Sequence, residues 1–310
     1  MRTALLLLAA CVGSVVAGST SLHDAVEKND ARQIADVLNS TQNPQDLLAF
    51  LDENELMPIH AAAWHGHIEA MAALVKGGAP VEARCSYGNM TALHWATGQD
   101  HQDVLQLLID SGANVEARDG GGRTALHFAA ARGHVGGLRA LIKARASLDA
   151  LSARNVTALQ MAAEHGFAEA VRILATAGAN LEAQTDGSRL AALHAAAAMG
   201  HADTVRALLQ AGAVLEVRDA RQRTPLHLAS AMGQVDVLRI LLSAGSALEA
   251  RDDEGATPRR LAGRRGRKAA VQILRQAGAQ SPWLHVRLFQ RLCRKVFHRT
   301  TVKDEKTANA

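Results

Sequence analysis

A period of 33 to 34 residues runs through most of this 310-residue chain and limits what it can fold into. Each period begins with a segment like TALHFAAARGH, continues with a second apolar block, and closes with a short extended piece such as VEAR. Self-similarity at such a period is typical of repeat architectures, whose single units are too small to bury an apolar face alone. The seven segments begin at Met57, Thr91, Thr124, Thr157, Ala191, Thr224 and Thr257.

Local signals predict two short helices in each period. Threonine at the start is a good N-cap, and Pro58, Pro225 and Pro258 fall at the first helical position, where no backbone donor is needed. Glycines such as Gly66 and Gly112 can end the two helices in a left-handed conformation. Aromatic residues make up only 3% of the chain. The core must therefore be built from Ala, Leu and Val, which favours helices over a β-sandwich.

In these motifs the chain resembles the ankyrin-repeat family. The resemblance implies an all-α solenoid of stacked helix-turn-helix units with short β-hairpin fingers. Residues 18–56 resemble a degenerate, more polar N-terminal capping repeat, as terminal repeats usually are. Seven full repeats then cover residues 57–280, with bounds at 57–90, 91–123, 124–156, 157–190, 191–223, 224–256 and 257–280.

The resemblance also implies a function and a surface. We expect a non-catalytic scaffold, itself a monomer, that binds another protein through the concave face formed by finger tips and first helices. Arginine is frequent among the variable positions of that face, so we expect it to be basic, with Trp64 as the best single anchor. The predicted partner-binding residues are Trp64, His65, Tyr87, Asn89, Met90, Gln99, Arg123, Arg132, Arg154, Glu164, His165, Arg189, Met199, Arg221, Arg223 and Met232.

Fourteen histidines raise the question of a metal site. Counterparts in stacked repeats should lie roughly 10 Å apart, too far to share an ion bound at about 2 Å. The resemblance implies instead that the first set hydrogen-bonds its own start turn and the neighbouring repeat. No catalytic or phosphate-binding motif is present in the sequence, so we expect no cofactor, metal or enzymatic activity. The first set is His60, His94, His127, His194 and His227, and the second is His67, His101, His134 and His201.

The extended pieces carry a second regularity. An acidic residue recurs in each, and an arginine often follows two residues later on the same side of an extended strand. We interpret these residues as adjacent acidic and basic rows that add solubility and a few tenths of a kcal/mol per exposed pair. The acidic row is Glu82, Glu116, Asp149, Glu182, Glu216 and Glu249, and the basic row is Arg84, Arg118, Arg218 and Arg251.

Departures from the pattern predict a weak place in the third full repeat. Arg145 occupies the left-handed glycine position after the second helix, which costs about 1 kcal/mol for a residue with a Cβ. Gly136 and Gly137 fall inside the same helix, each at roughly 0.5–1 kcal/mol relative to Ala. We therefore expect the stack to open locally near residues 130–150.

Residues 1–17 have the layout of a secretory signal peptide. Arg2 precedes an apolar run and then small residues, and the run is shorter than the ~20 residues that span a bilayer. The segment before Cys11 also resembles a bacterial lipoprotein cleavage box, which would make Cys11 the lipidated residue. We expect a secretory or membrane-associated protein; an uncleaved apolar start on a cytoplasmic protein is the alternative.

Residues 281–310 form a basic tail. A helical period places its apolar side chains on one face and arginines on the other. This helix could cap the last repeat, or its basic face could meet an anionic membrane surface or an acidic partner. The run from Phe289 to Arg294 also resembles half of the elongin-binding segment of ankyrin proteins with a SOCS box, which would indicate an intracellular adaptor that recruits a ubiquitin ligase. The predicted tail contacts are Trp283, Leu288, Phe289, Leu292, Cys293 and Phe297.

A block of basic residues between Arg259 and Lys268 lies within the last repeat. Basic clusters can bind nucleic acid or act as nuclear import signals. Aromatic platforms for single strands are missing from this block, and a polar terminal repeat is expected in any case. We therefore do not expect a nucleic-acid partner.

Overall fold

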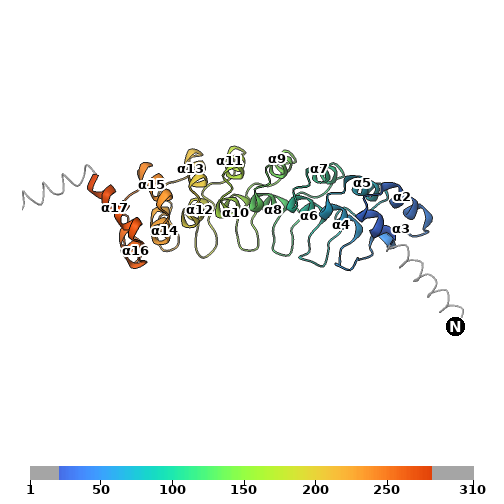
Figure 1. Ribbon diagram of the computed structural model, residues 1–310, viewed down its shortest axis with the longest axis horizontal. Coiled ribbons are helices and arrows are strands. Elements are labelled where there is room, and N and C mark those ends of the chain that lie inside the picture. The colour runs from blue at the N-terminus through green and yellow to red at the C-terminus, as the bar shows by residue number, and fades with distance from the viewer. Residues whose placement is uncertain (1–20, 281–310) are drawn as a thin grey trace, which may run out of the picture. The chain divides into compact units, whose positions relative to one another are not determined.

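The computed structural model describes residues 21–280 of the chain, which Figure 1 draws in colour. All regular elements in that range are helices, and it contains no β-strand. None of these helices is long and apolar enough to cross a bilayer. The predicted signal peptide at residues 1–17, the lipidation site at Cys11 and every predicted contact of the tail lie outside the described residues.

The helices follow one another in pairs. Before the first pair, residues 21–27 are helical and are followed by α2 (Ala31–Ser40) and α3 (Pro44–Leu48). The first helices of the pairs are α4 (Pro58–His65), α6 (Ala92–Gly98), α8 (Ala125–Arg132), α10 (Ala158–His165), α12 (Ala192–Met199), α14 (Pro225–Met232) and α16 (Pro258–Arg264). The second helices are α5 (Ile68–Lys76), α7 (Gln102–Asp110), α9 (Val135–Lys143), α11 (Ala168–Thr176), α13 (Ala202–Gln210), α15 (Val235–Ser243) and α17 (Lys268–Gln280).

The described residues form two compact bodies. The first body holds residues 21–196 and 203–214, and the second holds residues 197–202 and 215–280. In the first body, α4, α6, α8 and α10 contact one another in order, and α5, α7, α9 and α11 form a second row against them (Figure 1). In the second body, α14 contacts α16 and α15 contacts α17. The predicted stacking of helix pairs is confirmed within each body.

Small and branched apolar side chains fill the space between the helices. In the first body Leu126 and Ala129 of α8 and Leu138 and Leu141 of α9 are fully buried. Alanine on the first helices lets neighbouring backbones approach closely, and leucine from the second helices fills the remaining volume. Each pair buries its apolar face against the next one, so the helices are stabilised mainly by packing rather than by intrinsic propensity.

The predicted helix ends are confirmed. Gly66 and Gly133 end α4 and α8 in the left-handed region, with φ of 73° and 71°. Asp100 and Arg145 stand where other repeats have glycine, and both also have positive φ, 62° and 63°. A Cβ in this region costs about 1 kcal/mol. The predicted local strain at Arg145 is therefore present in the backbone.

The fingers are the loops that join the second helix of one repeat to the first helix of the next. Their arms are held by too few backbone hydrogen bonds to count as strands, so the expected β-hairpins are turns. In one finger the amide of Asp119 donates to the carbonyl of Arg123 at 2.9 Å, and the Asp119 carboxylate accepts from the amides of Gly121 and Arg123 at 2.9 and 2.7 Å. The Asp119 carboxylate thus takes the place of the backbone hydrogen bonds that would join the two arms of a β-hairpin.

The acidic residues of the extended pieces are exposed or half-buried, as expected for a surface row, but most of them also bond to the backbone of the next repeat. The Glu82 carboxylate accepts from the amide of Asn114 at 2.7 Å, and Glu116 accepts from the amide of Ser147 at 2.6 Å. Each bond reaches the backbone of the following repeat. Asp149 and Glu182 in the first body and Glu216 in the second make the same bond, to Asn180, Val214 and Ala247.

The arginines complete this link between repeats. Arg84 donates to the carbonyl of Asn89 in its own finger at 3.1 Å and to the carbonyl of Arg118 in the next repeat at 2.6 Å. Arg118 does the same with Gly122 and Leu151. Because the guanidinium groups of Arg84, Arg118 and Arg218 each hold two backbone carbonyls, these arginines align successive fingers. At position 151 the arginine is replaced by Leu151, which is 42% exposed.

Candidate functional site

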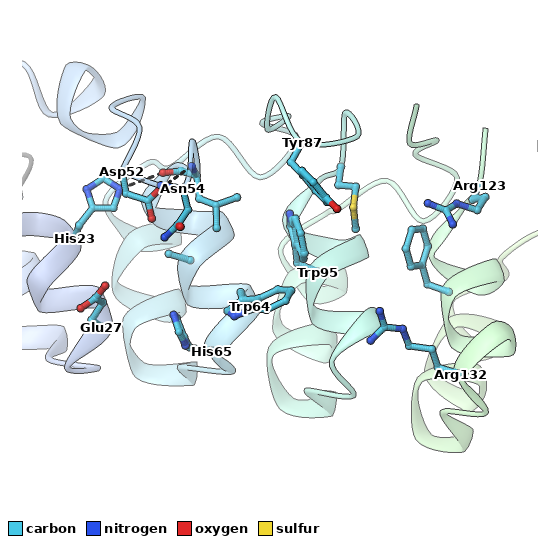
Figure 2. Close-up of a pocket in the computed structure, with 14 residues that line it drawn as sticks. His23, Glu27, Asp52, Asn54, Trp64, His65, Tyr87, Trp95, Arg123 and Arg132 are labelled. Atoms are coloured by element: carbon cyan, nitrogen blue, oxygen red, sulfur yellow. Dashed lines mark hydrogen bonds between the residues drawn. The ribbon is translucent and has the colours of Figure 1, made fainter. Parts of the chain in front are cut away.

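A groove of about 750 Å³ crosses the first helices of the first body. Figure 2 shows its floor, which runs from the helix at residues 21–27 over α4 and α6 to α8. Three kinds of side chain line it: acids and polar groups at the N-terminal end, aromatic rings in the middle and arginines at the far end. The lining residues are His23, Glu27, Asp52, Asn54, Leu56, Ala61, Trp64, His65, Tyr87, Met90, Trp95, Arg123, Phe128 and Arg132.

Three aromatic rings occupy the middle of the groove. The rings of Trp64 and Trp95 meet edge to face, with centroids 4.9 Å apart. Tyr87 comes from a finger and stacks on Trp95 at 6.0 Å. Tyr87 is 69% exposed and Trp64 is 40% exposed, whereas Trp95 is half-buried between them. Large exposed aromatic surface in a concave site is typical of interface hot spots.

Two arginines border the far end. Arg123 forms an ion pair with Asp119 at 2.7 Å, and its guanidinium lies 4.5 Å from the ring centroid of Phe128. Burial alone raises the pKa of Asp119, but the hydrogen bonds and charge of Arg123 outweigh it and leave the pKa below its ordinary value. Asp119 therefore remains ionised and fixes Arg123. Arg132 leaves α8 and donates to the carbonyl of Gly98 at 2.7 Å.

Acidic and polar groups border the opposite end. Glu27 is exposed on the helix at residues 21–27. The Asp52 carboxylate accepts from the amides of Asn54 and Leu56, both at 2.8 Å, and so holds the turn that faces the groove. His23 is within hydrogen-bond distance of the Leu56 carbonyl, at 3.2 Å. The groove is therefore acidic at one end, and the expectation of a basic face fits only the arginine end.

Six of the predicted partner-binding residues line this groove: Trp64, His65, Tyr87, Met90, Arg123 and Arg132. Met90 is only 6% exposed and thus forms floor rather than contact surface. The other predicted residues lie outside it. Asn89, Gln99, Arg154, Glu164, His165 and Arg189 belong to the first body, and Met199, Arg221, Arg223 and Met232 to the second.

Sequence reasoning missed Trp95, Phe128 and the whole N-terminal border of the groove. Trp95 and Phe128 follow the buried histidines directly, a position that reads as core because most repeats carry Ala, Leu or Met there. The aromatic character of these two residues was the available signal. The border at residues 23–56 was missed because the capping repeat was treated only as a cover for the stack.

The predicted role of the first histidine set is confirmed for His94, His127 and His227. It is wrong for His60, whose Nε2 contacts the carbonyl of Ala83 in its own repeat and whose Nδ1 has no hydrogen-bond partner among the described residues. His94 Nδ1 accepts from the amide of Thr91 at 3.2 Å, and its Nε2 lies 3.1 Å from the carbonyl of Arg123 in the next repeat. The second set faces the preceding repeat, as when His134 Nδ1 lies 2.9 Å from the carbonyl of Thr97. Burial lowers the pKa of His94 below its usual range, with a smaller opposing effect of its backbone bond. The His94 ring therefore serves the fold as a neutral connector between repeats.

The array of stacked helix pairs with left-handed glycine ends and fingers defines a helical repeat protein. The chain belongs to the ankyrin-repeat family, whose sequence model, described as ankyrin repeats (3 copies), matches residues 22–119, 116–185, 177–252 and 193–282. Ankyrin repeats are in general protein–protein interaction modules and in general non-catalytic. No curated protein shows a significant match to the chain.

Proposed function

We propose that this chain is a non-catalytic binding module that holds a partner protein in the groove over α4, α6 and α8. The observation that carries the proposal is the cluster of Trp64, Trp95 and Tyr87. Two of these rings expose large apolar areas at the centre of a groove that charged residues surround. Removing such surface from water stabilises a complex by roughly 25 cal/mol per Å² of apolar area.

The arrangement supports binding rather than chemistry. The buried rings of His94 and His127 are engaged in hydrogen bonds to backbone groups, and Asp119 is paired with Arg123. The part of the chain that the structure describes contains no group of three or more His, Cys, Asp or Glu side chains placed to hold a metal ion. The groove thus offers what an interface needs, which is an apolar centre with polar borders.

The experiment compares which proteins bind to the full chain and which bind to each of two groove variants. Trp64→Ala removes the anchor, and Tyr87→Ala removes a ring that is exposed enough to be dispensable for folding. Val214→Ala is the matched control, because Val214 is an apolar residue that is 52% exposed and lies outside the groove. Circular dichroism melts verify that all variants fold.

The expected result is a partner that the wild type and Val214→Ala retain equally and that both groove variants lose by at least tenfold, as expected for hot-spot residues. Quantitative mass spectrometry of the retained proteins measures this. Equal retention by all four proteins would place the binding surface outside the groove.

A further inference from the structure

The N-terminal border of the groove carries a concentrated negative charge. Residues 21–56 contain eight Asp or Glu and only two Lys or Arg. Glu27 and Asp52 line the groove itself, and no Lys or Arg lines it at this end. Glu27 is exposed, so its carboxylate can meet a cation of a partner without the large desolvation cost of a buried pair.

The opposite border carries a positive charge that is not neutralised. Arg132 is exposed on α8, and one of its guanidinium nitrogens donates to the carbonyl of Gly98 at 2.7 Å. Among residues 21–280 it forms no ion pair with a carboxylate. A guanidinium held by one bond keeps further N–H donors for a carboxylate in a bidentate geometry. Arg123, by contrast, is already paired with Asp119.

The aromatic cluster lies between the two charged borders, as Figure 2 shows. Trp64 and Tyr87 expose ring surface there. The indole Nε1 of Trp95 is buried and has no hydrogen-bond partner among the described residues. An unpaired buried donor costs about 1–3 kcal/mol, so a small rotation of the ring toward an acceptor on a bound chain would be favourable. The order along the groove is acid, aromatic, base.

We propose that the groove binds an extended peptide segment whose charges run opposite to its own. This proposal rests on the proposed function and specifies its partner. The segment carries Lys or Arg against Glu27 and Asp52, a bulky apolar side chain on Trp64 and Tyr87, and Asp or Glu against Arg132. The groove crosses four successive helices, or three spacings of 8–10 Å, about 27 Å in all. An extended chain covers that length with roughly eight residues.

Charge order along the groove is what distinguishes this partner from a simple apolar one. A basic face would accept any acidic segment, whereas this groove repels a uniformly acidic segment at Glu27 and a uniformly basic one at Arg132. Like charges brought together at an interface disfavour the wrong partner. The specificity is therefore set by the pair of borders and not by the net charge of the chain, which is +4.

The test selects peptides from a displayed library of random 12-residue sequences on the full chain, with a second round that discards those that still bind Trp64→Ala. Fluorescein-labelled copies of the enriched peptides are then titrated by fluorescence polarisation. The variants are Glu27→Lys and Arg132→Glu. The matched controls are Asp110→Lys, on the second helix α7, and Arg239→Glu, on the second helix α15 of the second body; both residues are exposed and outside the groove.

The expected peptides carry one basic and one acidic residue on opposite sides of an apolar one. Glu27→Lys should weaken them about threefold to fivefold, as expected for an exposed pair. Exchanging the basic peptide residue for Glu should restore binding to Glu27→Lys and weaken binding to the wild type. Arg132→Glu should respond in the same way to the acidic peptide residue, and the two controls should bind like the wild type.

Three results would overturn the proposal. The first is a set of peptides that require Trp64 but bind Glu27→Lys and Arg132→Glu as well as they bind the wild type. The groove would then bind peptides, but its charged borders would not select them. If no peptide depends on Trp64 while Trp64→Ala still loses a protein partner, the occupant is a folded surface. The segment of residues 283–298 has Lys and Arg but no Asp or Glu. If a synthetic peptide of this segment displaced the selected peptides, the chain's own tail would be the occupant.

Discussion

Replacing buried histidines by glutamine should make the array more resistant to acid. His94 and His127 each join their own helix start to the carbonyl of the next repeat. The fourth repeat has Gln160 at this position, and it makes the same bonds: its oxygen accepts from the amide of Thr157 at 2.8 Å and its nitrogen donates to Leu190 at 2.9 Å. Glutamine therefore already makes these contacts within this fold, and its side chain cannot take up a proton in this pH range.

The sign of the effect follows from the pKa of each ring. Burial lowers the pKa of His94 and of His127 in the folded chain below the ordinary value of about 6.5. The unfolded chain thus binds protons more readily, so stability is complete above pH 6.5 and falls as the pH drops below it. For each ring that stays neutral in the folded chain, the free energy of unfolding falls by about 1.4 kcal/mol at pH 5.5. Two such rings give a loss of up to about 2.8 kcal/mol.

Urea unfolding followed by circular dichroism at pH 7.5 and pH 5.5 measures this loss. The double variant His94→Gln/His127→Gln should lose up to about 2.8 kcal/mol less than the wild type between the two pH values. His165→Gln, at an exposed position of α10, is the control and should behave like the wild type. An identical loss in the double variant and the wild type would refute the reasoning, because the buried rings would then not be the groups that titrate.

Three stability predictions concern the third repeat, where we expect the stack to open first, and its neighbours. Gly137→Ala should stabilise the fold by about 0.5–1 kcal/mol in urea unfolding, because α9 gains helix propensity and the new Cβ meets neighbours only at 3.7 Å. Leu151→Arg should restore the missing link to the next finger and add roughly 0.5–1.5 kcal/mol, with greater amide-exchange protection over residues 130–150; unchanged protection would contradict it. Gly122→Ala should lower the melting temperature more than Gly187→Ala. Both have positive φ, but only at Gly122 would a Cβ meet backbone, at 2.7 Å from the amide nitrogen of Ala153.

The repeat fold could be predicted because its signals are local and recur. Threonine caps, left-handed glycines and the histidine after each start all act within one repeat or on its immediate neighbour. Even the exceptions were readable, since a residue at a glycine position must adopt the conformation that the stack imposes, as Arg145 does with φ of 63°. Periodicity supplies the same evidence several times, and a single ambiguous repeat cannot change the result.

The links between fingers could not be predicted because their partners are backbone atoms of another repeat. Glu82 and Arg84 have opposite charge and lie two residues apart, so the sequence suggests a pair. In the structure each reaches backbone groups about 30 residues away instead. A charge pattern in sequence shows which side chains share a side of a strand. It does not show which amide or carbonyl lies within their reach.

The groove was only partly predictable for a related reason. The family positions identify the exposed side chains of the first helices, and they led to Trp64, Tyr87 and Arg132. They do not identify half-buried side chains such as Trp95, and they do not apply to a terminal repeat whose sequence has diverged.

The third repeat links this groove to the stability of the array. Its first helix, α8, supplies Arg132 to the groove, and its second helix, α9, carries Gly136 and Gly137. The same repeat lacks the arginine link at Leu151. A ligand that binds only the stacked form stabilises it by RT ln(1 + L/Kd), where L is the free ligand concentration, so the effect grows with that concentration. A segment that spans α4 to α8 should therefore protect residues 130–150 from exchange more than the second body, because α8 lines the groove and α9 packs directly against α8.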